Sequence, residues 1–122
     1  MFPGHRRETS AAAFQLLALV EQYELDTATL LDDARAAGLY ARWTANFEEM
    51  RLIALSVPDL HLAWLHVLIS RAELVHLMWR ANNGQPLQGS IEDAAIPHQD
   101  AVTALRNRAM RMIRSETARL LS

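Results

Sequence analysis

Apolar residues recur along this chain at intervals of three and four positions, a spacing that predicts amphipathic helices. The pattern is clearest over residues 39–55, where five apolar side chains share one face: Tyr40, Trp43, Phe47, Met50 and Ala54. Polar residues such as Arg42 and Glu49 fall on the opposite face. No segment shows the strict alternation that is typical of a half-buried strand, so the pattern predicts an all-α protein.

Four residues indicate where these helices begin and end. Asp26 is suited to cap a helix N-terminus, and Gly38 to end a helix. Pro58 fits the first position of a helix, whereas Pro97 removes a hydrogen bond that a continuing helix would need. We expect helices over residues 11–24, 27–37, 39–55, 58–81 and 97–120, and one helical turn after Ser90. The predicted fold is all-α, a compact bundle of four main helices plus one or two short helices.

The length of 122 residues fits one domain. We expect residues 1–8 to form a flexible N-terminal tail and residues 9–122 to form a single helical domain. The sequence contains no cysteine, which excludes disulfides and thiolate metal ligands, and no motif in it implies a cofactor. All twelve basic residues are arginine, which is typical of a GC-rich bacterial genome. No apolar run reaches the ~18 residues that cross a bilayer, so we expect a cytoplasmic bacterial protein without a membrane partner.

The segment 58–81 is strongly apolar and also carries three histidines. We expect Trp64, Leu68 and Trp79 to lie in the core, which would place this helix at the centre of the bundle. Apolar residues cover so much of its circumference that one four-helix monomer would leave part of it exposed. The sequence therefore predicts a homodimer that buries part of this helix or of the preceding one.

A narrow polar stripe along the same helix contains His66, Glu73, His76 and Arg80. One interpretation is the solvent face of a mostly buried helix. The other is a metal site, because Glu73 and His76 are three positions apart and share a face, a spacing found in bundles that bind two metal ions. His66 is the third candidate ligand, and a second subunit would supply the rest.

Arg71 and His76 suggest a further chemistry. The segment RAELVH, from Arg71 to His76, resembles the Arg-x4-6-His motif of HEPN-domain proteins, which are small all-α domains and often RNases or toxins. The resemblance covers residues 71–79 and implies that Arg71 and His76 act on an RNA backbone near a dimer interface. Residues five apart lie roughly 140° around a straight helix, so such a site requires a bend or a second subunit.

The last predicted helix carries a concentration of basic residues. Arg106, Arg108, Arg111 and Arg114 are the candidates for binding another protein with an acidic surface. The net charge of −2 and the lack of aromatic residues among these arginines argue against nucleic acid. His98, near the start of this helix, has no predicted partner.

Two classes of function remain open. The first is a small non-catalytic protein-interaction module, such as an adaptor, secretion chaperone, immunity protein or regulator. The alternative is a HEPN-like RNase or toxin, or a metal-binding bundle, centred on residues 58–81. The two differ in whether the polar residues of that helix converge on a site.

Overall fold

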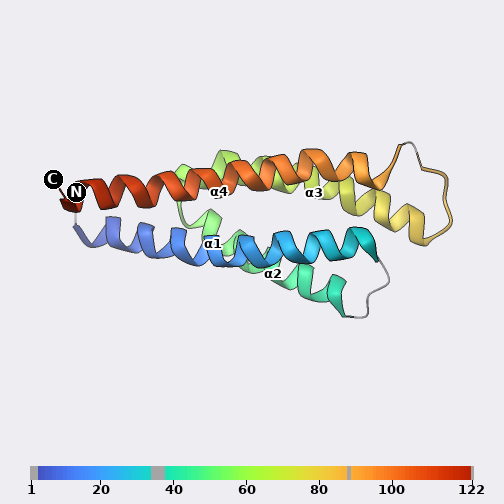
Figure 1. Cartoon of the computed structure of the whole chain (residues 1–122), viewed down its shortest axis with the longest axis horizontal. Helices are drawn as coiled ribbons and strands as arrows, with labels where there is room; N and C mark the ends of the chain where they lie inside the picture. The colour runs from blue at the N-terminus through green and yellow to red at the C-terminus, as the bar shows by residue number, and fades with distance from the viewer. Residues whose placement is uncertain (1–2, 34–37, 88, 122) are drawn as a thin grey trace.

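The computed structural model describes residues 3–33, 38–87 and 89–121, and these form an all-α bundle, as predicted (Figure 1). Its elements are α1 (Pro3–Asp32), α2 (Leu39–Leu55), the short 3-10 helix η1 (Pro58–Leu60), α3 (His61–Asn82) and α4 (Ile91–Leu121). η1 runs directly into α3, so four helices make up the compact bundle.

The two long helices, α1 and α4, lie side by side, with α2 behind α1 and α3 behind α4 (Figure 1). The closest packing is between α3 and α4, α1 and α4, and α1 and α2, whereas α2 and α3 contact each other only slightly. At one end, the N-terminal part of α1 and the C-terminal part of α4 extend beyond η1 as a pair (Figure 1). None of the helices over the described ranges is long and apolar enough to cross a membrane.

The core is built from the apolar stripes of all four helices. Its largest fully buried apolar side chains are Leu16, Val20, Tyr23, Leu30, Trp43, Met50, Leu60, Val67, Leu74 and Leu105. Trp43 stacks on Tyr23 with ring centroids 5.3 Å apart, and Phe47 lies 4.8 Å from Trp64. The first pair joins α1 to α2, and the second joins α2 to α3, whose backbones make few close contacts.

α1 is one continuous helix, whereas the sequence predicts a tail up to residue 8 and two helices divided at Asp26. Asp26 does not act as a cap. Its carboxylate accepts two hydrogen bonds from the Arg42 side chain, at 2.7 and 3.2 Å, and one from Gln22 at 3.0 Å. The side chain is therefore satisfied from α2 and from its own helix, and it does not compete for the backbone as a cap would. The end of the predicted helix 27–37 lies outside the described residues.

α4 starts at Ile91 and passes through Pro97 without a break, although the sequence predicts an interruption there. Ser90 caps its start, because the Asp93 backbone N–H donates to Ser90 Oγ at 2.9 Å. The proline removes only the bond to the carbonyl of Asp93. Pro97 and Asp93 are both exposed, so the Asp93 carbonyl is not buried in the core away from water.

The prediction that α3 lies at the centre of the bundle is wrong. Trp64 is buried as predicted, but Trp79 is 53% exposed and Leu68 is 43% exposed. α4 packs against one flank of α3, while α2 contacts the other flank only slightly, so the outer side of α3 has no neighbour within the described part of the chain. The apolar residues on that side lie at the surface instead of in the core.

Candidate functional site

A chain of buried hydrogen bonds joins three helices at the middle of the bundle. Tyr23 Oη on α1 lies 2.6 Å from His98 Nε2 on α4, and Ser70 Oγ on α3 lies 2.9 Å from His98 Nδ1. Ser70 Oγ also donates to the backbone carbonyl of Val67 at 3.1 Å. His98 thus links α1 and α3 through its two ring nitrogens.

The direction of these hydrogen bonds follows from counting protons. Ser70 gives its only hydroxyl proton to Val67, so Ser70 Oγ accepts from Nδ1–H of His98. His98 Nε2 is then without a proton and accepts from the Tyr23 hydroxyl. The arrangement assigns His98 to the Nδ1–H tautomer, in which the side-chain polar atoms of Tyr23, Ser70 and His98 all have hydrogen-bond partners.

Burial keeps the side chains of His98 and Tyr23 uncharged. Desolvation, the larger cause, and the positive charge of Arg71 together lower the pKa of His98 to about 4. Desolvation also raises the pKa of Tyr23 above its usual range, although the nearby Arg71 opposes that shift. His98 and Tyr23 are therefore both neutral near pH 7.

Arg71 lies beside these hydrogen-bonded side chains, with its guanidinium between two aromatic rings. Its Cζ is 4.3 Å from the centre of the Trp43 ring and 4.2 Å from that of Phe47. Nη2 donates to Thr44 Oγ1 at 3.1 Å, whereas Nε has no hydrogen-bond partner within the described structure. Cation–π attraction thus holds a half-buried charge that has no carboxylate bonded to it there.

Two further contacts tie α1 to α2. Trp43 Nε1 donates to Thr27 Oγ1 at 2.8 Å, and Thr27 in turn donates to the backbone carbonyl of Tyr23 at 2.7 Å. Asn46 donates to the carbonyl of Leu19 at 2.9 Å. The buried polar groups therefore fix the axial alignment of α1, α2, α3 and α4.

Ser70, His98 and Tyr23 do not form an accessible catalytic site in this arrangement. A hollow of about 210 Å³ between α1 and α4 reaches toward Tyr23 and His98, yet both side chains are 0% exposed. Ser70 donates to a carbonyl and not to the imidazole, so His98 does not activate it as a general base would. The geometry supports a structural role.

The sequence contains the spacing that places His98 in the core, although the sequence analysis assigns it no partner. The buried residues of α4 follow intervals of three and four: Ala95, His98, Val102, Leu105 and Ala109. Periodicity therefore indicates a buried imidazole. Its partners Tyr23 and Ser70, 75 and 28 residues away in sequence, come together only in the folded chain.

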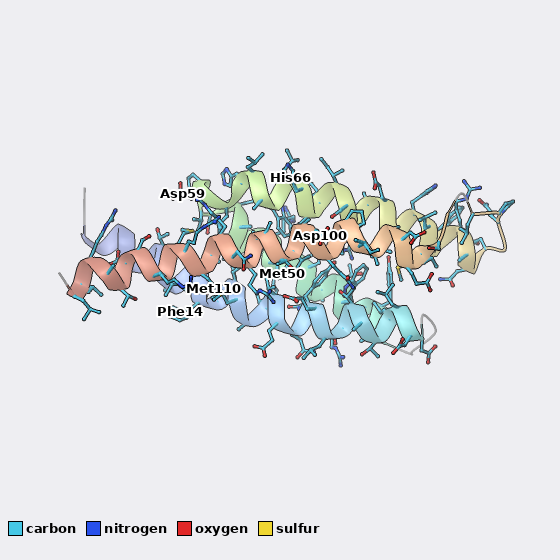
Figure 2. All side chains as sticks on the ribbon, turned by 45° about the horizontal axis from the view of Figure 1, so that its top comes forward. Phe14, Met50, Asp59, His66, Asp100 and Met110 are labelled. Carbon is cyan, nitrogen blue, oxygen red and sulfur yellow. The ribbon has the colours of Figure 1, made fainter. Side chains whose placement is uncertain are left out.

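The polar stripe of α3 is divided between two surfaces. His66 and Glu73 line a shallow groove between α3 and α4, which Asp100 also lines. Figure 2 shows His66 on the side of α3 away from α1. His76 lies outside that groove, and all three of the predicted metal ligands are exposed. No three His, Asp or Glu side chains in the described ranges come close enough together to hold a metal ion.

Arg71 and His76 do not face each other within one chain. The guanidinium of Arg71 is held against Trp43 and Phe47, while the His76 side chain is exposed. This matches their separation around a straight helix. The arrangement on which the HEPN resemblance depends is therefore not assembled in the single chain.

The four candidate arginines of α4 differ in their contacts. Arg106 forms an ion pair with Glu24 at 3.1 Å, and Arg108 Nε lies 3.4 Å from the backbone carbonyl of Asp59. Arg111 and Arg114 are exposed and make no ion pair with a described residue. Among these four arginines, Arg106 alone has its charge paired with a carboxylate of a described residue.

A polar hollow of about 330 Å³ lies where α4 extends beyond η1. It is lined by residues of α1, η1 and α4: Thr9, Ser10, Asp59, Arg108, Arg111, Met112, Ser115, Glu116 and Arg119. Figure 2 shows Asp59 at the start of the η1–α3 segment, above the C-terminal half of α4. Three arginines and two carboxylates line this hollow, which leaves an excess of positive charge.

Comparison with models of known families, with curated proteins and with solved structures finds no match to this chain. Its function must therefore be argued from the chemistry of its own surfaces.

Proposed function

We propose that this protein is a non-catalytic interaction module that binds an acidic segment of another protein with the C-terminal half of α4. The observation that carries the proposal is the hollow beside η1, where Arg108, Arg111 and Arg119 gather around about 330 Å³. We call this the arginine surface. Guanidinium groups bind carboxylates through paired hydrogen bonds, so a cluster of them favours Asp and Glu side chains.

The extension of α1 and α4 beyond η1 gives a partner access to this surface. Arg111 and Arg114 are exposed on α4, and Phe14 of α1 is 60% exposed. Leu120 is 72% exposed at the end of α4. An acidic segment with a few apolar residues would complement this mixture of charge and apolar area.

The buried polar residues support a role without catalysis. Tyr23, Ser70 and His98 satisfy one another in the core, and Arg71 is held by two aromatic rings. The exposed His66, Glu73 and His76 do not belong to any group of three potential metal ligands among the described residues. Binding at an exposed helix requires none of these groups to react.

Fluorescence anisotropy with labelled probes tests the proposal. The probes are a short peptide of alternating glutamate and leucine, a matched lysine and leucine peptide, and a single-stranded RNA. We expect only the glutamate peptide to bind, more weakly as salt concentration rises, since the attraction is between exposed charges. Arg108→Glu/Arg111→Glu should abolish binding, whereas Arg51→Glu, a charge reversal on α2, should leave it unchanged. The proposed role of the arginine surface would be refuted if the protein preferred RNA. It would also be refuted if the double variant and the Arg51→Glu control bound the glutamate peptide equally well.

A further inference from the structure

α3 carries a second stripe on its outer side, apolar except for His76 and separate from the apolar stripe that faces the core. Its six residues follow intervals of three, four, three, four and three: Leu62, Leu65, Ile69, Ala72, His76 and Trp79. All six are exposed, and Leu62 and Ile69 are 68% and 53% exposed. This regular spacing is that of the contact positions in a coiled coil. We call these six residues the outer stripe.

We propose that the outer stripe binds the outer stripe of a second copy of this chain, with the two α3 helices antiparallel about a twofold axis. A twofold axis pairs the same surface with itself, so one self-complementary stripe is sufficient. When Ile69 lies opposite Ala72 of the second copy, every position of the stripe finds a counterpart. The pairs are then Leu62 with Trp79, Leu65 with His76, and Ile69 with Ala72, each made twice.

The charged residues beside the stripe favour this register. On the flank next to α4, it brings His66 of one copy opposite Glu73 of the other, and symmetry makes that pair twice. Sliding one helix by a heptad in one direction would place Glu73 opposite Glu73. Sliding it in the other direction would place His66 opposite His66 and leave Trp79 without a counterpart. Two carboxylates in register repel each other, and the other shift leaves Trp79 unpaired, so the proposed alignment is favoured over both.

The opposite flank of the stripe is complementary in a different way. In the same register, Leu68 lies opposite Val75 of the second copy, and both residues are apolar. Leu68 is 43% exposed and Val75 is partly buried in the single chain. A parallel pairing would instead place Leu68 beside Glu73, and this mismatch favours the antiparallel arrangement. The proposal concerns α3 and does not rest on the arginine surface of α4.

Sedimentation equilibrium at micromolar concentration provides the first test. We expect a mass near twice 13.8 kDa for the unaltered chain. Ile69→Glu should reduce it to 13.8 kDa, because it places a charge at the middle of the stripe. Phe14→Glu is the matched control, since it adds the same charge at an exposed apolar residue of α1, and it should leave the mass doubled. A monomeric unaltered chain, or a dimeric Ile69→Glu variant, would overturn the proposal.

Exchange of charges and cross-linking test the register itself. Glu73→Arg should weaken the dimer, and His66→Glu/Glu73→Arg should restore it by reversing the pair. The chain has no cysteine, so Leu65→Cys/His76→Cys can report one contact cleanly. These positions are ~16 Å apart along one helix, too far for a disulfide within the chain, and we expect a covalent dimer. Ile69→Cys/Trp79→Cys reports the heptad-shifted register and should not cross-link. Cross-linking of the second pair alone, or failure of the charge reversal to restore the dimer, would rule out this register.

Discussion

The hydroxyl of Tyr23 donates to His98 Nε2 across 2.6 Å of the core, between residues that are 75 positions apart in sequence. This contact explains why a histidine occupies a position with no exposed surface. A neutral imidazole has one donor and one acceptor, and the structure matches the donor with Ser70 and the acceptor with Tyr23. The pairing holds α1, α3 and α4 in one alignment.

Tyr23→Phe should destabilise the protein by about 1–3 kcal/mol, the cost of leaving a buried acceptor without its donor. The change removes one oxygen and leaves the stacking on Trp43 in place. Tyr40→Phe is the control, because Tyr40 is exposed, and it should change stability by less than about 0.5 kcal/mol. Urea unfolding of the two variants measures the difference. Equal stability would mean that the hydrogen bond contributes nothing.

His98 should make the protein less stable in mild acid. Its pKa is about 4 in the folded chain and 6.5 in the unfolded chain, so between these values only the unfolded state is protonated. Its contribution is complete above pH 6.5 and is lost as the pH falls toward 4, by about 3 kcal/mol in total. Unfolding free energies measured from pH 7 to pH 4 test this. His98→Leu should lose this component of the pH dependence, and an unchanged slope in that variant would contradict the assignment.

Arg42→Ala should leave the Asp26 carboxylate buried with Gln22 as its remaining side-chain donor. We expect a loss of stability, because the buried carboxylate loses two of its three hydrogen bonds, and Asp26→Asn/Arg42→Ala should recover part of it. Arg42 holds the pKa of Asp26 below its ordinary value. The stabilisation from this pair is therefore present above that ordinary value and is lost as the pH falls through the lowered one. A double-mutant cycle measures the coupling, and a coupling of zero would show that the pair does not act as a unit.

Leu74→Ala and Leu68→Ala distinguish the two sides of α3. Leu74 is 1% exposed, so its truncation should cost about 2–5 kcal/mol. Leu68 is exposed, so its truncation should cost about 1 kcal/mol or less. Both should be measured in the Ile69→Glu background, where association makes no contribution. Equal losses would mean that Leu68 is packed as tightly as Leu74.

Local periodicity was sufficient to predict α2 with its observed bounds, because its face of Trp43, Phe47 and Met50 has a simple repeat. The junction at Pro58 was also predictable, since proline suits the start of a helix. These features depend on residues within a few positions of one another. The sequence alone is enough for them.

The remaining features depend on contacts between distant residues. The residue type of Asp26 and its place in the sequence predict a helix cap, but its carboxylate binds Arg42 of α2 instead. Trp79 and Leu68 were predicted to be core residues because they are apolar. They are exposed because α2 and α3 contact each other only slightly, which leaves the outer side of α3 uncovered. His98 follows the apolar repeat of α4, a signal of burial that was not used, and its partners were not predictable from spacing.

Photo-cross-linking at Arg111 most directly tests the claim that this protein acts by binding another protein. p-Benzoylphenylalanine replaces Arg111 in the native cells, and Ala28, exposed on α1, is the control position. We expect an adduct between position 111 and a protein other than a second copy of this chain. That adduct should be absent at position 28 and lost when Arg108→Glu is added. An adduct with nucleic acid, or no adduct at position 111, would contradict it.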